Sequence, residues 1–406
     1  MVVLAEASKV PPRLAAPRLA AGVILLLAGL AALSSLATNI ILPSFPSIGG
    51  ALGVTTRELA VTLSSFFVAF ALGQLVVGPL SDRFGRRPVV LGGLLIFIIG
   101  SVVAASALTM ELLIAGRIVQ ALGVCAASVL SRAIARDMFE GQDLARALSF
   151  TTVATAAASG FSPLLGTAID ILFGWRMTFL LVAAAGVVMA IAYRLLVSET
   201  LAPDSRSPTS LVKAGRSYGA LLIDMRFLAP ALTVSLIIGG LFAFFAAAPA
   251  VLIDGFGVGP FGLSVFFAAT VLVVFGVGLL APPFSRRMGH TRATLRGALL
   301  AFIGSALVLA SVGAGLSLIW FTLALTVFLF GMGLVNPLGT ALTLQPFGNQ
   351  AGLASALLGF LQMSCAALAT TANTLLPFSA AAAIGIVLTI NTGLAVLVFL
   401  RSTPQA

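Results

Sequence analysis

Long apolar segments fill most of the chain, and short polar loops separate them. Each segment is apolar on every face and reaches the length of about 20 residues that a helix needs to cross a bilayer. Only helices and closed barrels satisfy the backbone in lipid, and a barrel would show alternating segments of about ten residues. The pattern predicts twelve membrane-spanning helices, at about residues 19–43, 57–80, 88–108, 110–134, 146–170, 175–197, 228–252, 261–284, 293–313, 315–337, 350–376 and 378–400.

The composition indicates that lipid is the main solvent of the chain. Hydrophobic residues make up 60% of it and charged residues only 8%, whereas soluble proteins average about 25% charged residues. Such a chain cannot cover a globular surface with polar side chains, and it lacks the charge of disordered segments. An all-α polytopic membrane protein is expected, and the water-soluble and disordered classes are excluded.

The basic residues indicate how the chain is oriented. With the N-terminus inside, nineteen of the 22 Lys and Arg residues fall on cytoplasmic segments, Arg57 and Arg176 fall outside, and Arg117 lies within a span. Cytoplasmic loops of membrane proteins carry such an excess of positive charge. Both termini are therefore expected in the cytoplasm, and a membrane explains the net charge of +10 without a nucleic-acid partner.

A polar stretch at residues 198–227 predicts a flexible linker between two halves. At an offset of 204 residues, segments 90–101 and 294–305 share six of twelve residues, and Gly85 falls over Gly289. Two repeats of the same orientation are typical of transporters that bind substrate at the midplane. The expected units are a cytoplasmic tail (1–18), a six-helix bundle (19–197), the linker (198–227), a second six-helix bundle (228–400) and a cytoplasmic tail (401–406).

The loop after the second span carries a charged motif, GPLSDRFGRR, at residues 78–87. Gly78 would let two helices approach closely. Asp82 lies near a helix end, where it can pair with a neighbouring helix or cap its N-terminus, and the arginines can hold the loop at the anionic leaflet. A basic loop that serves only topology is the alternative. The residues expected to form a gate are Gly78, Asp82, Arg83, Gly85, Arg86 and Arg87.

Two spans of the first half contain further unusual residues. Arg117 lies in RIVQALG of the fourth span, and a charge inside a span is costly unless it faces a cavity or a partner, or reaches a span end. The fifth span reads GFSPLLGTAID, in which small residues and a proline permit close packing and a bend. Its key residues are Gly160, Pro163 and Gly166.

These motifs resemble those of the major facilitator superfamily, and they are similar to its 12-span drug:proton antiporter branch. The charged loop looks like the signature loop of the family, RIVQALG like its second motif, and the fifth span like its antiporter motif, with Ser162 and Thr167 where glycines are usual. The stretches NIILPSFPSI (39–48), SETL (198–201) and FAFFAAAP (242–249) look like those of the bicyclomycin/chloramphenicol-type (Bcr/CflA) resistance exporters. The resemblance covers essentially the whole chain. It implies the major facilitator fold, with two pseudo-symmetric six-helix bundles, and an alternating-access drug exporter of the bacterial inner membrane.

Position 39 departs from that subfamily, in which an aspartate is common. Asn39 cannot carry a proton, and no carboxylate lies deep in any expected span. A proton antiporter usually carries its proton on an embedded carboxylate, so the sequence leaves proton coupling open. Asp170 is the remaining candidate for a proton carrier, and a helix-end acid paired with Arg176 is the alternative interpretation.

The charge left within the spans bears on the substrate. Arg117 is the only formal charge there, so the cavity is expected to be neutral to positive and to favour neutral or anionic compounds over quaternary cations. Amides and aromatic residues stranded in the spans are candidates for its lining, although they can equally pack between helices or face lipid. They are Asn39, Gln74, Gln120, Phe242, Phe245, Asn336 and Gln362, with Asn373, Phe66, Phe67, Phe70 and Phe244 as further candidates.

Export is not the only function that the sequence admits. An importer or facilitator of a small metabolite within the same superfamily is the main alternative, and a membrane sensor without flux would need a signalling domain. An enzyme is not expected, because the sequence has one His, no cluster with metal-ligand spacing and no nucleophile–base pair. The expected protein is a monomer without cofactor or metal, whose partners are a small-molecule substrate, membrane lipids and, if transport is coupled to them, protons.

Overall fold

A computed structural model of the chain describes residues 17–201, 211–313 and 317–402, and every regular element in these ranges is a helix. Twelve of these helices are long and apolar enough to cross a membrane, as the sequence predicts. The first half contains α1 (Pro17–Asn39), α3 (Thr56–Phe84), α4 (Arg86–Ala105), α5 (Met110–Met138), α6 (Gly141–Phe173) and α7 (Arg176–Leu196). The second half contains α9 (Met225–Ala248), α10 (Pro260–Met288), α11 (His290–Gly313), α12 (Leu318–Leu344), α13 (Ala351–Leu375) and α14 (Ala380–Ser402).

Shorter elements connect the spans: η1 (Leu42–Ser44), α2 (Phe45–Leu52), α8 (Leu211–Ile223), the π-helical turn η3 (Pro249–Gly255) and the 3₁₀ turn η4 (Gln345–Gln350). Most of the predicted N-terminal tail (1–16), residues 202–210 of the predicted linker and residues 403–406 of the predicted C-terminal tail lie outside the described ranges.

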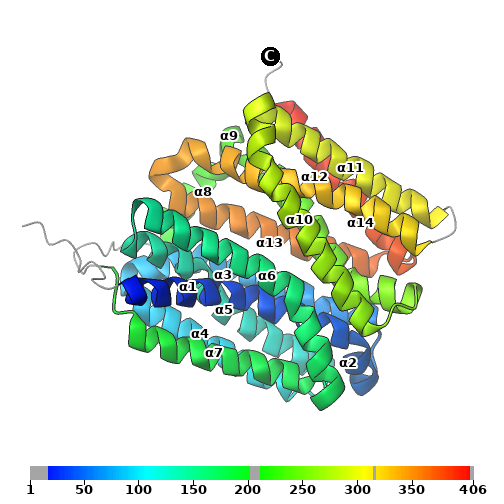
Figure 1. Cartoon of the computed structure of the whole chain (residues 1–406), viewed down its shortest axis with the longest axis horizontal. Coiled ribbons are helices and arrows are strands. Elements are labelled where there is room, and N and C mark those ends of the chain that lie inside the picture. The colour runs from blue at the N-terminus through cyan, green and yellow to red at the C-terminus, as the bar shows by residue number, and fades with distance from the viewer. Residues whose placement is uncertain (1–16, 202–210, 314–316, 403–406) are drawn as a thin grey trace, which may run out of the picture.

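The two halves form separate bundles with the same internal packing. In Figure 1 the first half, from blue to green, lies below the second half, from yellow to red. Helix α4 packs on α5 and α7 as α11 packs on α12 and α14, and α1 packs on α6 as α9 packs on α13. The bundles meet mainly along two helix pairs, α3 with α13 and α6 with α10. We refer to these two contacts together as the seam.

The repeat in the sequence corresponds to a repeated helix contact. Gly100 in α4 and Gly304 in α11 lie 204 residues apart. A Cβ added to Gly100 would lie 2.3 Å from a backbone nitrogen of α5, and one added to Gly304 would lie 2.2 Å from a backbone nitrogen of α12. The turns that follow α3 and α10 also match, because Gly85 and Gly289 both have positive φ, 97° and 80°. The predicted pseudo-symmetric fold is confirmed.

The first span is interrupted, which the apolar pattern does not predict. The expected helix runs over residues 19–43, whereas α1 ends at Asn39 and the chain turns through η1 into α2. Pro43 has no N–H to bond the carbonyl of Asn39, four residues earlier, and its ring would clash with that carbonyl. The carbonyls in the last turn of α1 are therefore left without partners inside the helix.

The predicted linker contains a helix. In α8 the buried residues Ala214, Tyr218 and Leu221 follow the spacing of one helical face and pack on α9 and α13. The hydroxyl of Tyr218 donates to the backbone oxygen of Leu75 in α3, at 3.3 Å. Burial raises the pKa of Tyr218 to about 12, so its hydroxyl stays protonated at neutral pH. Within the predicted linker, residues 211–223 are thus a helix that touches both bundles.

Because successive spans alternate in direction, the loops gather at two ends of the molecule (Figure 1). The turns after α3, α5 and α10, the end of α7 and both described chain ends lie at the end that carries most of the arginines, which we call the basic end. The segment around α2 and the α4–α5, α6–α7 and α13–α14 loops lie at the other end, which we call the far end.

Candidate functional site

At the far end of the seam, Arg57 at the start of α3 binds the end of α13. Its guanidinium donates to three backbone oxygens, those of Asn373 (2.9 Å), Leu376 and Phe378 (2.7 Å). The last carbonyls of a helix lack intrahelical partners and carry partial negative charge, which a cation complements. Arg57, which the sequence suggested only as an outside arginine, therefore holds the two bundles together.

Two further hydrogen bonds join the bundles at this end. The hydroxyl of Thr56 donates to the carboxylate of Asp254 in η3. The hydroxyl oxygens of Thr167 in α6 and Ser264 in α10 lie 2.8 Å apart. Thr167 occupies a position at which the resembled motif has glycine, and here its hydroxyl makes a contact between the bundles. The far end of the seam is closed.

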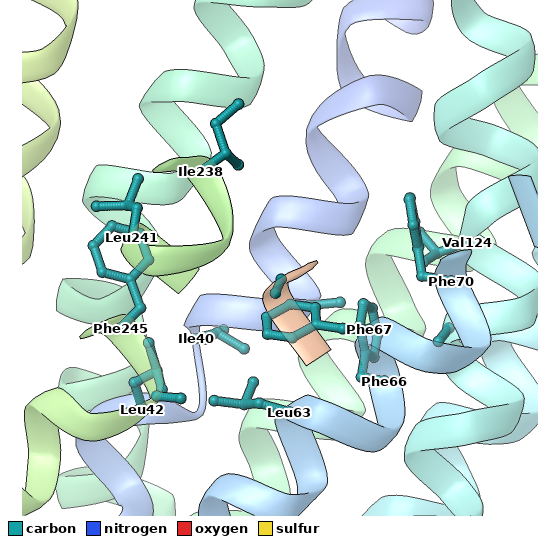
Figure 2. Close-up of a cluster of buried hydrophobic side chains, with 14 of the residues drawn as sticks. Ile40, Leu42, Leu63, Phe66, Phe67, Phe70, Val124, Ile238, Leu241 and Phe245 are labelled. Atoms are coloured by element: carbon teal, nitrogen blue, oxygen red, sulfur yellow. The ribbon is translucent and has the colours of Figure 1, made fainter. Parts of the chain in front are cut away.

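Aromatic rings fill the seam further along α3. The ring centres of Phe67 in α3 and Phe242 in α9 lie 5.1 Å apart, and those of Phe242 and Phe245 lie 6.4 Å apart. Figure 2 shows Phe66, Phe67 and Phe70 together on α3, with Phe70 beside Val124, and Leu241 and Phe245 of the other bundle across the view. Phe242 and Phe245, expected to line a cavity, take part in this aromatic contact in the present arrangement.

Gln74 lies in the contact between α3 and α13, and Leu75 beside it packs on the buried cluster formed by α8, α9 and α13. Gln74 is only 8% exposed, and its Oε1 lies 1.8 Å from the position of a Cβ added to Gly359, so its side chain fills the space that this glycine leaves. Gly78 lies one turn closer to the basic end, and no atom lies within 4 Å of the Cβ position there. The structure thus does not place Gly78 against a second helix, as the sequence suggested. Helices α6 and α10 diverge toward the basic end (Figure 1).

The loop after α3 is held by acids of its own bundle and of the segment that follows α7. Arg86 pairs with Asp82 at 2.5 Å and with Asp137 in α5 at 3.1 Å. The carboxylate of Glu199 accepts from the backbone N–H groups of Arg86 (2.8 Å) and Arg87 (3.1 Å), and so caps the N-terminus of α4. Asp137 and Glu199 were missed in the sequence, although each is an acid beside a helix end at the basic end.

The other residues of the predicted gate lie around this network. Gly85 makes the turn with a φ of 97°, and Arg87 donates to the backbone oxygen of Arg194 at 3.0 Å. Arg83 is exposed, with its guanidinium carbon 5.2 Å from the ring centre of Phe84. These contacts stay within the first bundle, and the side chain of Asp82 is 45% exposed.

Arg117 lies wholly inside the first bundle, with an exposed fraction of 0%. Its Nη1 donates to the backbone oxygen of Ala37, in the last turn of α1, at 2.8 Å, and to Oε1 of Gln120. Its guanidinium carbon lies 4.4 Å from the ring centre of Phe66. Its Nε and Nη2 have no hydrogen-bond partner. Arg117 therefore faces internal partners and does not reach a span end.

The amides near Arg117 differ in their roles. Gln120 also donates to the hydroxyl of Ser101 in α4 at 2.8 Å, so it links α5 to α4. Asn39 is 2% exposed. Its Nδ2 donates to the backbone oxygen of Ser35 at 3.1 Å, and its Oδ1 has no partner.

The motif of the fifth span lies in α6, against both α1 and α10. Pro163 is buried inside α6. A Cβ added to Gly160 would lie 3.1 Å from the Cβ of Val271 in α10, and one added to Gly166 would lie 1.9 Å from the backbone oxygen of Ile40. These small residues let α6 touch the other bundle and the broken end of α1.

Asp170 lies near the far end of α6 and accepts a hydrogen bond from the hydroxyl of Ser47 in α2 at 2.8 Å. Arg176, suggested as its alternative partner, donates instead to the backbone oxygen of Ala107 at 3.0 Å and lies over the ring of Trp175. In the part of the chain that the structure describes, ion pairs join Arg86 to Asp82 and Asp137 and Arg226 to Asp224.

The remaining candidates lie in the second bundle. Asn336 in α12 and Gln362 in α13 are half-buried. Asn373 is buried, and its Oδ1 has no partner. The ring of Phe244 packs on Phe321 of α12, with centres 6.4 Å apart. Phe244 therefore belongs to the core of its bundle.

Comparison with known proteins places most of the chain in one family. Residues 27–370 match the Major Facilitator Superfamily. The chain is 33% identical over 341 residues to the uncharacterized MFS-type transporter YdgK of Bacillus subtilis, over 83% of this chain and 85% of the relative. It is 28% identical over 386 residues to multidrug resistance protein D of Escherichia coli (93% and 94%). It is 32% identical over 259 residues to the chloramphenicol resistance protein of Pseudomonas aeruginosa (63% and 60%).

Solved structures share the fold at low identity. The D-xylose-proton symporter has a TM-score of 0.76 and 17% identity, over 96% of this chain and 99% of the symporter. The human organic anion transporter MFSD10 (TETRAN) has a TM-score of 0.68 and 19% identity, over 95% and 99%. At these identities the likeness extends to the fold alone.

Proposed function

The chain belongs to the major facilitator superfamily, and we propose that it exports small organic molecules from the cytoplasm by alternating access. One observation carries this proposal: hydrogen bonds join the bundles at the far end of the seam, whereas α6 and α10 diverge toward the basic end (Figure 1). Relatives named for resistance to several drugs and to chloramphenicol favour export over import. The fold is shared with a sugar symporter as well, so the direction of transport rests on these relatives.

The basic end is taken to face the cytoplasm, because cytoplasmic loops carry the excess of Lys and Arg. A substrate would then enter from the cytoplasm between the parted ends of α6 and α10 and reach the rings of Phe67 and Phe242. Release outside requires the bonds of Arg57 and of Thr167 to break. The exposed Asp82, at the end of α3, would approach the N-terminus of α13 as the basic end closes. Packed interfaces change between two such arrangements rather than deform continuously.

The proposed substrates are neutral or anionic lipophilic compounds. The rings in the seam offer apolar contact, and Arg117 is the only charge buried deep in the spans that the structure describes. A lipophilic cation would find no carboxylate there to pair with, and an unpaired charge in such a site is costly.

Resistance of a pump-deficient bacterial host tests both the function and the substrate class. Expression of the chain is expected to raise the inhibitory concentration of neutral chloramphenicol about fourfold or more, and that of cationic ethidium by less than about twofold. Protection against ethidium without protection against chloramphenicol would overturn the substrate proposal. Protection against neither drug would remove the support for drug export.

A cross-linked variant supplies the control for alternating access. Cysteines in place of Thr167 and Ser264, in a chain whose Cys125 and Cys365 are alanine, would put two thiols where hydroxyls lie 2.8 Å apart. A disulfide formed there on the oxidising outer side would hold the far end shut. Transport is expected to stop in the oxidised variant and to return with a membrane-permeable reductant. Undiminished transport by the oxidised protein would contradict the mechanism.

Asp170 is the proposed proton carrier, since no carboxylate lies deeper in the described spans. Asp170→Asn is expected to lower drug uptake driven by a pH gradient in everted vesicles about tenfold, with exchange of drug down its own gradient preserved. Glu111→Gln, which changes another acid close to the far end, is the matched control and is expected to keep gradient-driven uptake. Full gradient-driven uptake by Asp170→Asn would exclude Asp170 from this role.

A further inference from the structure

We infer that Arg117 and the broken end of α1 form a binding site for the carboxylate group of an organic anion. This inference rests on the proposed export function and specifies its substrate class. The site would lie inside the first bundle, under the aromatic rings that face the seam.

No acid among the residues that the structure describes balances the charge of Arg117. The side chain is fully buried, and its contacts are neutral: a backbone oxygen, the Gln120 amide and the Phe66 ring. The three ion pairs of the described residues all lie elsewhere, at the basic end. The C-terminal end of α1 carries only about half an elementary negative charge, which is less than the full positive charge of the guanidinium. A buried charge normally has an ionic partner, so a negative group is missing here.

The two unpartnered nitrogens of Arg117 fit a carboxylate. They are Nε and Nη2, whose N–H groups lie along one edge of the planar guanidinium. That edge binds the two oxygens of a carboxylate through parallel hydrogen bonds. Nη1, on the other side, is already used by Ala37 and Gln120. The structure therefore leaves free the edge that a carboxylate requires.

Other buried polar atoms without partners belong to the same region of the chain. They are Oδ1 of Asn39 and the hydroxyls of Ser44 and Ser162. Asn39 ends α1, two residues after Ala37, and Ser44 follows in η1. Ser162 lies one turn before Gly166, which abuts the Ile40 carbonyl. Buried polar groups nearly always have a partner, so these unpartnered atoms mark the segments around the end of α1 as a region where polar groups of a ligand could bind.

Aromatic rings connect this site to the movement of the bundles. Phe66 covers Arg117, its ring centre lies 6.1 Å from that of Phe70 and 6.3 Å from that of Phe67, and Phe67 in turn contacts Phe242 of the other bundle. Figure 2 shows this row of rings on α3. When α9 moves away from α3, Phe67 loses its partner and Phe66 is free to turn. Separation of the bundles would therefore open the site, and their contact closes it.

Binding of two matched ligands to the purified chain in lipid nanodiscs tests the inference. The probes are 2-naphthoate and 2-naphthamide, which share one ring system and differ in charge. The wild-type chain is expected to bind naphthoate about tenfold more tightly. Arg117→Gln is expected to lower the affinity for naphthoate about tenfold or more and the affinity for naphthamide less than about twofold. Equal affinities of the wild type for the two probes, or absence of naphthoate binding, would overturn the inference. The chloramphenicol test then still decides the export function.

A second variant keeps Arg117 and so avoids the loss of a buried side chain. Asn39→Asp adds a carboxylate at the end of α1, in the proposed site, where its negative charge would oppose that of the ligand. This variant is expected to bind naphthoate about tenfold more weakly than the wild type. Two controls are expected to change the affinity for naphthoate less than about threefold. Asn39→Ala removes the amide without adding charge, and Asn391→Asp adds an acid in α14. Equal effects of Asn39→Asp and Asn39→Ala would show that charge at this position does not matter, and would contradict the site.

Discussion

Gly100→Ala is expected to reduce the amount of folded protein recovered from membranes about tenfold or more, because the added Cβ would lie 2.3 Å from the backbone nitrogen of Gln120. The backbones of α4 and α5 would have to move apart, and overpacking of this kind costs about 1–3 kcal/mol or more. Gln120 also binds Arg117 and Ser101, so the shift would disturb the buried charge. Recovery of monodisperse protein by size-exclusion chromatography, with the unfolding temperature, measures the effect.

Gly92→Ala is the matched control in the same helix. Gly92 is exposed, and no atom lies within 4 Å of its Cβ position. Alanine is favoured over glycine in a helix by about 0.8–1.0 kcal/mol, so this variant is expected to fold at least as well as the wild type. Gly304→Ala is expected to reproduce the loss in the second bundle, where the Cβ would lie 2.2 Å from the backbone nitrogen of Phe328. Equal recovery of Gly100→Ala and Gly92→Ala would contradict the close contact between α4 and α5.

Arg57→Ala is expected to open the far end and to increase labelling of a cysteine at position 167 from outside about tenfold or more. The substitution removes three hydrogen bonds between the bundles. Each hydrogen bond to a charged group contributes about 1.5–3 kcal/mol, so their loss shifts the balance toward the outward-open arrangement. Thr167 is 3% exposed in the closed arrangement. Labelling of Thr167→Cys with an impermeant maleimide, in a chain whose Cys125 and Cys365 are alanine, reports the opening.

Arg176→Ala is the control for this measurement. Arg176 is the other arginine expected outside, but its bond to the backbone oxygen of Ala107 stays within the first bundle. Its loss is therefore expected to change the labelling rate less than about twofold. If Arg57→Ala labels no faster than Arg176→Ala, the far end is held by other contacts, and Arg57 does not control it.

Most of the spans could be predicted because their signal is local. A run of about 20 apolar residues is sufficient to define a spanning helix, whatever the rest of the chain does. The break after Asn39 was missed because the apolar run continues to residue 43, although Pro43 carried the signal. Helix α8 was missed because the polar composition around it concealed the spacing of Ala214, Tyr218 and Leu221. Composition is an average over a whole stretch, so it does not reveal a short helix within a polar linker, whereas the spacing of the apolar residues does.

The sequence allowed several residues of the candidate site to be predicted, but not the residues that they contact. Arg117, Asn39 and Asp82 stand out because polar groups are rare in such a chain. Their partners do not stand out: Arg86 meets Asp137 of α5, and Arg57 meets carbonyls of the α13 end more than 300 residues away. No spacing in the sequence indicates these contacts, because Asp137 lies 51 residues from Arg86 in another helix and the partners of Arg57 are backbone oxygens, which are present at every position.

The sequence alone shows that the chain is surrounded mainly by lipid, that it has twelve spans, that its two halves are repeats and that position 39 has no acid. These are properties of single residues and short segments, which act through transfer into lipid and through local helix geometry. The closure of the far end and the divergence of α6 and α10 toward the basic end follow only from the packing of the two bundles, and the unpartnered edge of Arg117 follows from packing within the first bundle. They depend on atoms that are distant in the chain, and the relative position of two rigid bundles is not encoded in any one segment.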